Sequence, residues 1–291
     1  MYALQSGIER KENNVDDSLV AHVHVHDRYY DTAVKNKYYS RSYTLKGERK
    51  INVSDEISFG FGSDYNYNKG EFNVHGSWGS YARGHSDNLG LFTNFGYKFN
   101  ENTIFSSHLR GDKHKYSQEN ITYRLNLTKL INNFALSISE STGLRHPDLY
   151  VLHGGNTGGT FKSMATTKPE TSLTREASLK YYFSDDVSFQ TTAYKGTISD
   201  VLNRGTATQG YNEIIDIKQE GLENSFVLKD DFQRLSLSNT FSKSREDDGS
   251  PQLRRPEQQF DLNYSRKFIS NTFGPFDLNY DYRHVGKVED W

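Results

Sequence analysis

The sequence predicts an all-β fold, an antiparallel transmembrane β-barrel of which this chain forms a part. Two observations support that class. Apolar and polar residues alternate along several segments with no sustained helical period, and short turns alternate with long polar loops. The mean hydropathy of -0.81 excludes a bundle of apolar membrane helices. It suits a barrel, whose strands present one apolar and one polar face.

The alternation is clearest in four segments, where every second residue is apolar. These segments are 121–128, 134–139, 176–183 and 276–283. Such a period of two is typical of a strand with one apolar and one wet face. Several strands are expected to reach ten residues or more, close to the ~9–11 that a tilted strand needs to cross a bilayer.

The connections between these segments are of two lengths. Short turns are expected at 100–102, 131–133, 184–186 and 230–231, and long loops at 67–86, 110–119, 145–172, 199–212 and 243–256. Outer-membrane barrels have short periplasmic turns and long extracellular loops. The pattern therefore predicts about fourteen strands in one barrel domain over residues 1–291.

The composition excludes several other classes of protein. With 20 Tyr and 18 Phe the chain is too aromatic to be disordered. The absence of Cys excludes a disulfide scaffold, a Cys-ligated metal and a Cys nucleophile. The net charge of -2 provides no positive field that would attract nucleic acid.

Four segments, in order, resemble those of the TonB-dependent outer-membrane receptors, and most closely the vitamin B12 (cobalamin) receptor type. Ser139–Tyr150 is similar to the family stretch S-x-G-F-R-A-P-x-L-Y-E-L. Lys168–Glu170, followed by Glu176, resembles L-K-P-E…E-x-G. Ile217–Glu223 resembles the strand N-x-x-x-A-x-I-x-G-x-E, and Arg254–Pro256 resembles the R-R-P strand entry. Together these segments span about residues 85–285.

The resemblance implies a barrel of about 22 strands in the outer membrane of a Gram-negative cell, with a plug inside it. It implies active uptake of a scarce nutrient, cobalamin or an iron-siderophore, with the periplasmic TonB protein as partner. The chain shows no plug or TonB-box sequence, no signal peptide at Met1–Ser6 and no alternating final strand at Gly286–Trp291. We therefore expect a partial barrel, surrounded by outer-membrane lipid, with no cofactor and no enzymatic activity.

Six residues are candidates for binding the ligand, most of them in predicted outer loops. They are Trp78, Tyr81, Arg145, Tyr150, His153 and Asn156. Aromatic and amide groups can stack on and hydrogen-bond a bulky ligand, and Arg145 could hold an anionic one. The competing interpretation is an interfacial aromatic girdle, simple loop packing and a charged rim.

Other motifs are weaker. His22, His24 and His26 share one face of a strand and could bind a transition metal, but ordinary lumen-facing residues are the expected interpretation, so no metal site is predicted. Asp16-Asp17 could bind Ca²⁺, although a solvated turn is favoured. The His153-Gly154-Gly155 sequence suits an esterase loop, but no G-x-S-x-G follows it.

Two other classes of function remain as alternatives. A passive porin or structural barrel needs an inward loop that is often acidic, and the 145–172 loop holds only Asp148 and Glu170 as acids. A soluble secreted β protein would bury one strand face in a core and tolerate charge on the other. Solubility that depends on detergent would distinguish a membrane barrel from it.

Overall fold

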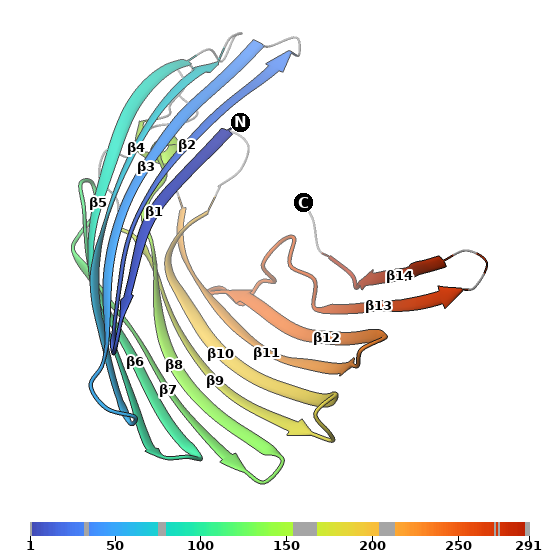
Figure 1. Ribbon diagram of the computed structural model, residues 1–291. Helices are drawn as coiled ribbons and strands as arrows, with labels where there is room; N and C mark the ends of the chain where they lie inside the picture. The colour runs from blue at the N-terminus through green and yellow to red at the C-terminus, as the bar shows by residue number, and fades with distance from the viewer. Residues whose placement is uncertain are drawn as a thin grey trace.

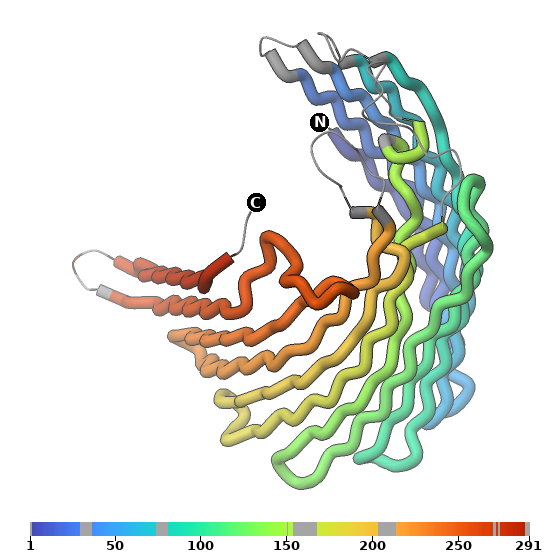
Figure 2. The backbone as a smooth tube through the Cα atoms, turned by 180° about the vertical axis from the view of Figure 1, so that it is seen from behind, coloured from blue at the N-terminus to red at the C-terminus, as the bar shows by residue number. Residues whose placement is uncertain are grey.

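The computed structural model describes residues 2–31, 35–74, 80–153, 168–203, 213–270, 272 and 274–288. These residues form one antiparallel sheet of 14 strands, each hydrogen-bonded to the next along the chain. The sheet bends into a deep open trough with β1 and β14 at its two edges (Figures 1 and 2). The predicted all-β antiparallel class and the strand number are confirmed.

The strands vary greatly in length, and one short helix interrupts their succession. The elements are β1 (Tyr2–Glu12), β2 (Val15–Asp31), β3 (Lys35–Asn52), β4 (Ile57–Val74), β5 (Ser80–Asn100), β6 (Thr103–His114), β7 (Asn120–Ile131), β8 (Phe134–Arg145), α1 (Leu149–His153), β9 (Glu170–Tyr182), β10 (Val187–Asn203), β11 (Glu213–Lys229), β12 (Gln233–Glu246), β13 (Gln258–Ser270) and β14 (Gly274–Val285). In the described part of the chain, no helix has the length and apolar character needed to cross a membrane.

The strand register separates the polar and apolar residues onto opposite faces of the sheet. One row across β7–β12 consists of Leu127, Ile138, Ala177, Ala193, Leu222 and Phe241. The adjacent row, on the opposite face, consists of Asn126, Ser139, Glu176, Tyr194, Gly221 and Ser242. Because side chains along a strand alternate between faces, each strand presents an apolar outer and a polar inner surface.

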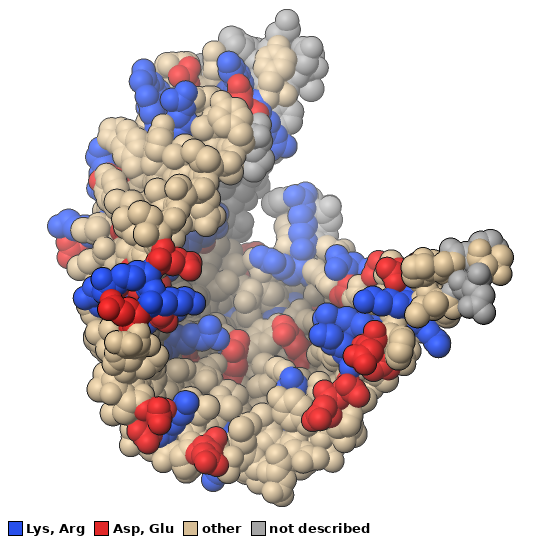
Figure 3. Space-filling model, viewed as in Figure 1, with Lys and Arg blue, Asp and Glu red and all other residues tan. Residues whose placement is uncertain are grey.

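The apolar face is the convex outer one, and it is largely uncovered. Leu45 is 51% exposed, Leu91 59% and Ile138 58%. In the view of Figure 3, which includes the hollow of the trough, Lys, Arg, Asp and Glu side chains gather in separate groups among uncharged residues. A water-soluble protein rarely exposes so continuous an apolar surface. The outer face is therefore suited to lipid rather than water, as expected for a membrane barrel.

Aromatic residues line the outer face at the short-turn end of the strands. This aromatic girdle comprises Phe59, Phe61, Phe95, Tyr97, Phe99, Phe105, Phe134, Tyr181, Phe183, Phe268 and Phe276. The rings contact one another across and along strands, with centroids 4.6 Å apart for Phe134 and Tyr181 and 5.0 Å apart for Phe268 and Phe276. Such rings mark the interface between lipid headgroups and acyl chains.

The predicted short turns are confirmed at this end of the sheet. Asn132 lies between β7 and β8 with φ of 50°, and Asn13 between β1 and β2 with φ of 51°. Asn tolerates this left-handed conformation better than most residues. In the β11–β12 turn, Asp230 accepts the backbone N–H groups of Phe232 and Gln233, which lower the pKa of its carboxyl group.

Several of the predicted long loops are wrong, because strands extend through them. Residues 67–74 and 80–86, within the predicted 67–86 loop, belong to β4 and β5. Similarly, β6 continues to His114, β10 to Asn203 and β12 to Glu246. Outside the membrane both faces of a strand meet water, so the apolar–polar alternation weakens although the backbone pairing continues. The extension of β10 contains a bulge between Ile198 and Val201.

Candidate ligand-binding site

The short helix α1 lies on the concave inner face of the trough, against β4 and β5 (Figure 2). Two glycines paired across these strands, Gly70 and Gly84, provide its space. A Cβ atom on Gly70 would lie 3.1 Å from Leu149 Cδ1, and one on Gly84 would lie 1.9 Å from His153 Cδ2. The wall is therefore shaped to receive the helix.

Both ends of α1 are fixed to their surroundings. Asp148 Oδ1 accepts the backbone N–H of Val151 at 2.8 Å, a cap for the first turn. Val151 and Leu152 are buried, with 6% and 2% exposure. The rings of His153 and Tyr116 meet edge to face with centroids 5.2 Å apart. The helix is thus held by a cap, by apolar burial and by an aromatic contact.

Replacing Asp148 with alanine should loosen α1 without altering the strands. Loss of an N-terminal cap costs about 1 kcal/mol, so the Val151 and Leu152 amides should exchange with deuterium about fivefold faster. Hydrogen-exchange mass spectrometry of the detergent-solubilised protein measures this rate. Asp148→Asn, which keeps a capping oxygen, should remain close to wild type. Unchanged exchange in Asp148→Ala would show that the cap is unimportant.

A cavity of about 530 Å³ lies beside α1 on the inner face, within the size range of small-ligand pockets. It is lined by Ser40, Arg41, Ser42, Asn66, Asn68, Lys69, Phe72, Ser86, Asn88, His114, His146, Pro147, Asp148 and Leu149. Eight of these 14 residues carry hydroxyl, amide or imidazole groups, and Phe72, Pro147 and Leu149 contribute apolar surface. The cavity lies toward the long-loop end of the strands, which is the extracellular end in outer-membrane barrels.

Two stacked histidines form one side of this cavity. The rings of His114 and His146 are nearly parallel, at 12°, with centroids 4.4 Å apart. The backbone N–H of Tyr116 donates to His114 Nδ1 at 3.2 Å, and Ser117 Oγ lies 2.8 Å from His146 Nδ1. Burial lowers the pKa of His146 below its usual value, so this imidazole is neutral at pH 7.

Two polar atoms on the cavity wall are buried without a hydrogen-bond partner among the described residues. They are Asn88 Oδ1 and His146 Nε2. Buried polar atoms nearly always have a partner, so such pairs of atoms in a cavity indicate a place for a bound polar group or water. His153 Nε2, next to the cavity, is also buried without a hydrogen-bond partner among the described residues. This part of the wall therefore offers three polar atoms that a bound polar group or water could satisfy.

A charge cluster supports the wall below the cavity, on the same face. The Nε and Nη2 atoms of Arg110 each donate to the Asp112 carboxylate at 2.7 Å, and Nη2 also donates to Asp64 Oδ1 at 3.1 Å. Asn88 donates to Asp112 at 2.7 Å, which links the cluster to the cavity. The Asp64 and Asp112 side chains are only 11% and 5% exposed. Arg110 therefore neutralises two carboxylates that are largely removed from water.

The ligand-binding residues predicted from the sequence do not lie together where the structure describes them. His153 lies beside the cavity as part of α1. Arg145 ends β8 on the inner face, 71% exposed and ion-paired with Glu170 at 3.0 Å. Tyr81 lies in β5 rather than in a loop, on the outer face and 61% exposed. Their role in ligand binding stays a prediction.

The other three predicted positions are only partly described. Trp78 and Asn156 lie outside the described residues. Tyr150 belongs to α1, but its side chain lies outside the described part of the structure. The ligand contacts predicted for all three remain predictions.

The three histidines of β2 lie on the inner face, near the cavity. His22, His24 and His26 pair with Thr44, Ser42 and Ser40 of β3, two of which line the cavity. Among the described residues, no three His, Cys, Asp or Glu side chains are arranged to hold a metal ion. The pair Asp16-Asp17 lies within β2 rather than in a turn, with its two carboxylates on opposite faces.

The sequence analysis missed most of the residues that form the cavity. Asn68 and His114 fall within the predicted loops 67–86 and 110–119, and Asn66 and Asn88 are not among the predicted site residues. The alternation places each Asn on the inner face, but only the register shows that they lie side by side. His146 lies within the stretch that resembles the receptor family, although no pattern in the chain predicts its stacking on His114.

A family profile matches nearly the whole chain. The family is described as TonB dependent receptor-like, beta-barrel, and the match covers residues 3–290. No curated protein sequence matches the chain.

Solved structures with the same fold are outer-membrane receptors with low sequence identity. The ferric yersiniabactin uptake receptor FyuA from Yersinia pestis superposes with a TM-score of 0.75 at 9% identity, over 98% of this chain and 49% of that one. The siderophore receptor PirA from Acinetobacter baumannii gives 0.71 at 15% identity, over 98% and 51%. The ferripyoverdine receptor of Pseudomonas aeruginosa gives 0.73 at 11% identity, over 97% and 49%.

The chain spans about half the length of these receptors, as the 49–51% coverage shows. Family members are transporters and receptors rather than enzymes, and a passive porin is not favoured. The profile match, the open polar-lined trough and the apolar outer wall together lead to one assignment. This chain belongs to the TonB-dependent receptor β-barrel family of the Gram-negative outer membrane.

Proposed function

We propose that this chain forms part of the barrel wall, and the outer end of the lumen, of a receptor that actively imports an iron chelate. The observation that carries the proposal is the inner cavity beside α1, where Asn88 Oδ1 and His146 Nε2 are buried and have no hydrogen-bond partner within the described part of the chain. A large polar chelate offers the donors and acceptors that such a wall requires. The names of the similar structures, which include siderophore receptors, support the same ligand class.

The proposed mechanism requires no covalent chemistry by this chain. The chelate binds at the outer end of the lumen, and the TonB protein acts on a plug to open a passage through the barrel. The polar inner face supplies hydroxyl and carboxylate groups along that passage, as in the row Ser139, Glu176 and Tyr194. Cobalamin, the ligand suggested by the resemblance of the sequence motifs, is the competing cargo.

An uptake assay distinguishes these ligands. Cells that produce the receptor should be given a radiolabelled ferric tris-catecholate, ferric tris-hydroxamate or ferric citrate complex, or labelled cobalamin. We expect one ferric complex to accumulate and the accumulation to stop when an ionophore collapses the proton-motive force. Uptake of cobalamin alone would replace the iron assignment. Uptake that continues after the collapse would mean passive diffusion and would overturn the proposed function.

The cavity can be tested with the chelate that is taken up. His146→Ala removes the imidazole that stacks on His114 and should weaken binding about tenfold, because it deletes both a ring contact and a buried hydrogen-bonding atom. His284→Ala, on the outer face of β14, is the matched control. Isothermal titration in detergent measures the affinity. Equal affinities of the two variants would place the ligand elsewhere.

A further inference from the structure

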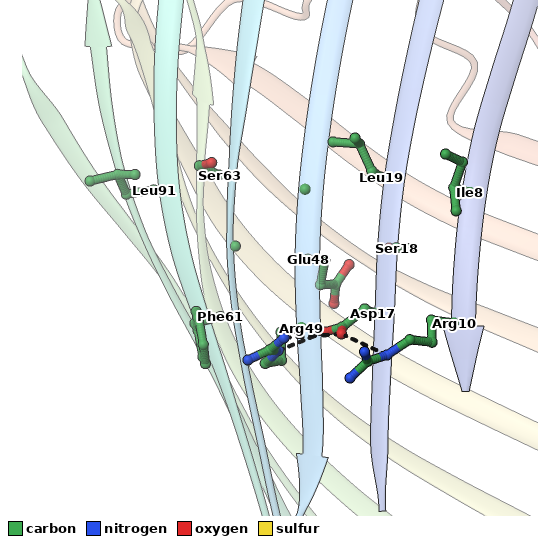
Figure 4. Close-up of a pocket in the computed structure, with 12 residues that line it drawn as sticks. Ile8, Arg10, Asp17, Ser18, Leu19, Glu48, Arg49, Phe61, Ser63 and Leu91 are labelled. Carbon is green, nitrogen blue, oxygen red and sulfur yellow. Dashed lines mark hydrogen bonds and ion pairs between the residues drawn. The ribbon is translucent and has the colours of Figure 1, made fainter. Parts of the chain in front are cut away.

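A second cavity lies on the opposite, outer face of the wall and contains unexpected charges. The register aligns Arg10, Asp17 and Arg49 in one row across β1, β2 and β3. Figure 4 shows Arg10 and Arg49 directed toward Asp17 from the two neighbouring strands. Charged residues on a lipid-facing surface are costly unless they are paired or lie at the interface.

The three residues form an ion-paired cluster with donors to spare. Arg49 binds Asp17 through two contacts, Nε to Oδ1 at 2.6 Å and Nη2 to Oδ2 at 3.0 Å. Arg10 Nε lies 3.5 Å from Asp17 Oδ2, and its Nη2 lies 3.3 Å from Glu12 Oε2. A guanidinium has five N–H donors, so each Arg retains donors beyond those that its carboxylate partner can accept.

An apolar groove extends from the cluster toward the middle of the wall. The next row along the strands is Ile8, Leu19, Gly47, Ser63 and Leu91. Gly47 and Ser63 are the small residues of this row, and the register places them between the larger Leu19 and Leu91, all of which line the cavity. The cavity has a volume of about 640 Å³, and its lining residues include Arg10, Asp17 and Arg49 of the cluster and also Glu48, whose side chain the register directs to the opposite face.

The position of the cluster corresponds to the headgroup level of the periplasmic leaflet. Asp17 lies two residues beyond Val15, the first residue of β2 after the short turn, a distance of about 7 Å along the strand. Phe61 of the aromatic girdle continues the same row on β4. Headgroup regions are about 5–8 Å thick, so the charges lie near the boundary with the acyl chains.

We propose that this cavity binds one glycerophospholipid of the periplasmic leaflet. The guanidinium groups of Arg10 and Arg49 hold its phosphate, and one acyl chain lies in the groove above Gly47. Charge-assisted hydrogen bonds from Arg to phosphate are strong and directional. Ion pairing with Asp17 and Glu12 accounts for both arginines, but it does not explain the apolar groove that continues from them.

The charge balance of the cluster favours a zwitterionic headgroup. Arg10 and Arg49 supply two positive charges, and Asp17 and Glu12 supply two negative ones. A phosphatidylethanolamine carries a phosphate and an ammonium group, and Glu12, 64% exposed at the edge of the cluster, can accept the ammonium. An anionic phosphatidylglycerol has no cationic group that could pair with the Glu12 carboxylate. We therefore expect ethanolamine lipids to be preferred.

Native mass spectrometry of the protein extracted from outer membranes in detergent tests the proposal. Phosphatidylethanolamine is titrated into the delipidated protein, and the occupancy of the first bound lipid is followed. Arg49→Gln should lower the apparent affinity about tenfold. Gly47→Leu should lower it similarly by filling the groove. A Cβ at Gly47 meets only Leu19 Cδ1, at an ordinary contact distance of 3.8 Å, so the first atom of a new side chain fits without a clash.

The matched control is Arg175→Gln. Arg175 also lies on the outer face in an ion pair, 2.6 Å from Glu140, but β9 places it in the extracellular half of the wall. This control should bind the lipid like wild type. Wild-type binding by both Arg49→Gln and Gly47→Leu, in protein that retains its folded mobility on gels, would overturn the proposal.

Two further comparisons identify the bound species. Inorganic phosphate and glycerophosphoethanolamine, which lack acyl chains, should not displace the lipid. Displacement by either would show a phosphate site rather than a lipid site and would overturn the proposal. Phosphatidylglycerol should bind less tightly than phosphatidylethanolamine. Equal binding of the two would overturn the preference assigned to Glu12.

Discussion

Replacing Gly84 with alanine will displace α1 from the inner wall and lower the affinity for the proposed iron chelate at least about tenfold. A Cβ at this position would lie 1.9 Å from Cδ2 and 2.2 Å from Cγ of His153. Such distances require the imidazole to move. The ring is confined by its edge-to-face contact with Tyr116, so the helix must move with it.

Two measurements check this effect of Gly84→Ala. Hydrogen exchange at Val151 and Leu152 should accelerate, and titration with the transported ferric chelate should show the weaker binding. Gly111→Ala is the control, because a Cβ on Gly111, in the neighbouring strand β6, meets nothing within 4 Å. If Gly84→Ala retains both slow exchange and wild-type affinity, then α1 does not depend on this glycine and its position on the wall is not part of the binding site.

Replacing Arg110 with alanine will destabilise the wall by about 3 kcal/mol, because it leaves two largely buried carboxylates facing each other without a cation. The cost is expected to exceed that of other ion pairs in this chain. Asp64 and Asp112 are 11% and 5% exposed, and Asp112 also anchors Asn88 of the cavity. The variant should therefore lose ligand affinity as well as stability.

Urea unfolding in detergent, followed by the gel mobility of the folded barrel, measures the stability of Arg110→Ala. Lys113→Ala is the control on the same strand. Lys113 and its partner Glu119 are 74% and 71% exposed, so their pair is worth at most about 1 kcal/mol. Gly90→Ala offers an independent approach, since its Cβ would lie 2.1 Å from Arg110 Nη2. If Arg110→Ala and Lys113→Ala unfold at the same urea midpoint, the stabilising role given to Arg110 is wrong.

The strands that cross the membrane could be predicted well from the sequence. In the segment Ile121–Thr128, one face must meet lipid and the other must meet the lumen, so apolar and polar residues alternate. The structure places this segment within β7, as expected. Each hairpin then pairs with the next along the chain, so the order of strands also follows from the sequence.

The strand extensions could not be predicted in the same way. In β4, the register places Lys69 and Glu71 on the same outer face as Tyr65 and Tyr67, although all four belong to one continuous strand. Water replaces lipid around that part of the outer face, so the selection for apolar residues ends before the hydrogen bonding does. A reading based on hydrophobic periodicity therefore assigns the end of the strand to a loop.

The cavity was the hardest feature to predict, because it depends on a loop that folds back onto the wall. His114 and His146 come from different hairpin arms, and only their final positions bring the rings to 4.4 Å. The role of Gly70 and Gly84 could not be predicted from the sequence either. Neither has a positive φ that a turn would require, and their role is to leave room for side chains of a distant helix.

The unequal strand lengths give the rim of the trough a slope that affects how a ligand arrives. β5 has 21 residues and its neighbour β6 has 12, and the two start together at the short-turn end. The difference of nine residues corresponds to about 30 Å along the strand direction. β3–β5 thus extend well beyond the membrane on the outer side, while β6–β9 end closer to its surface. Among the described strands, a ligand from outside would thus meet a low rim along β6–β9 and a tall wall along β3–β5, where α1 and the cavity lie.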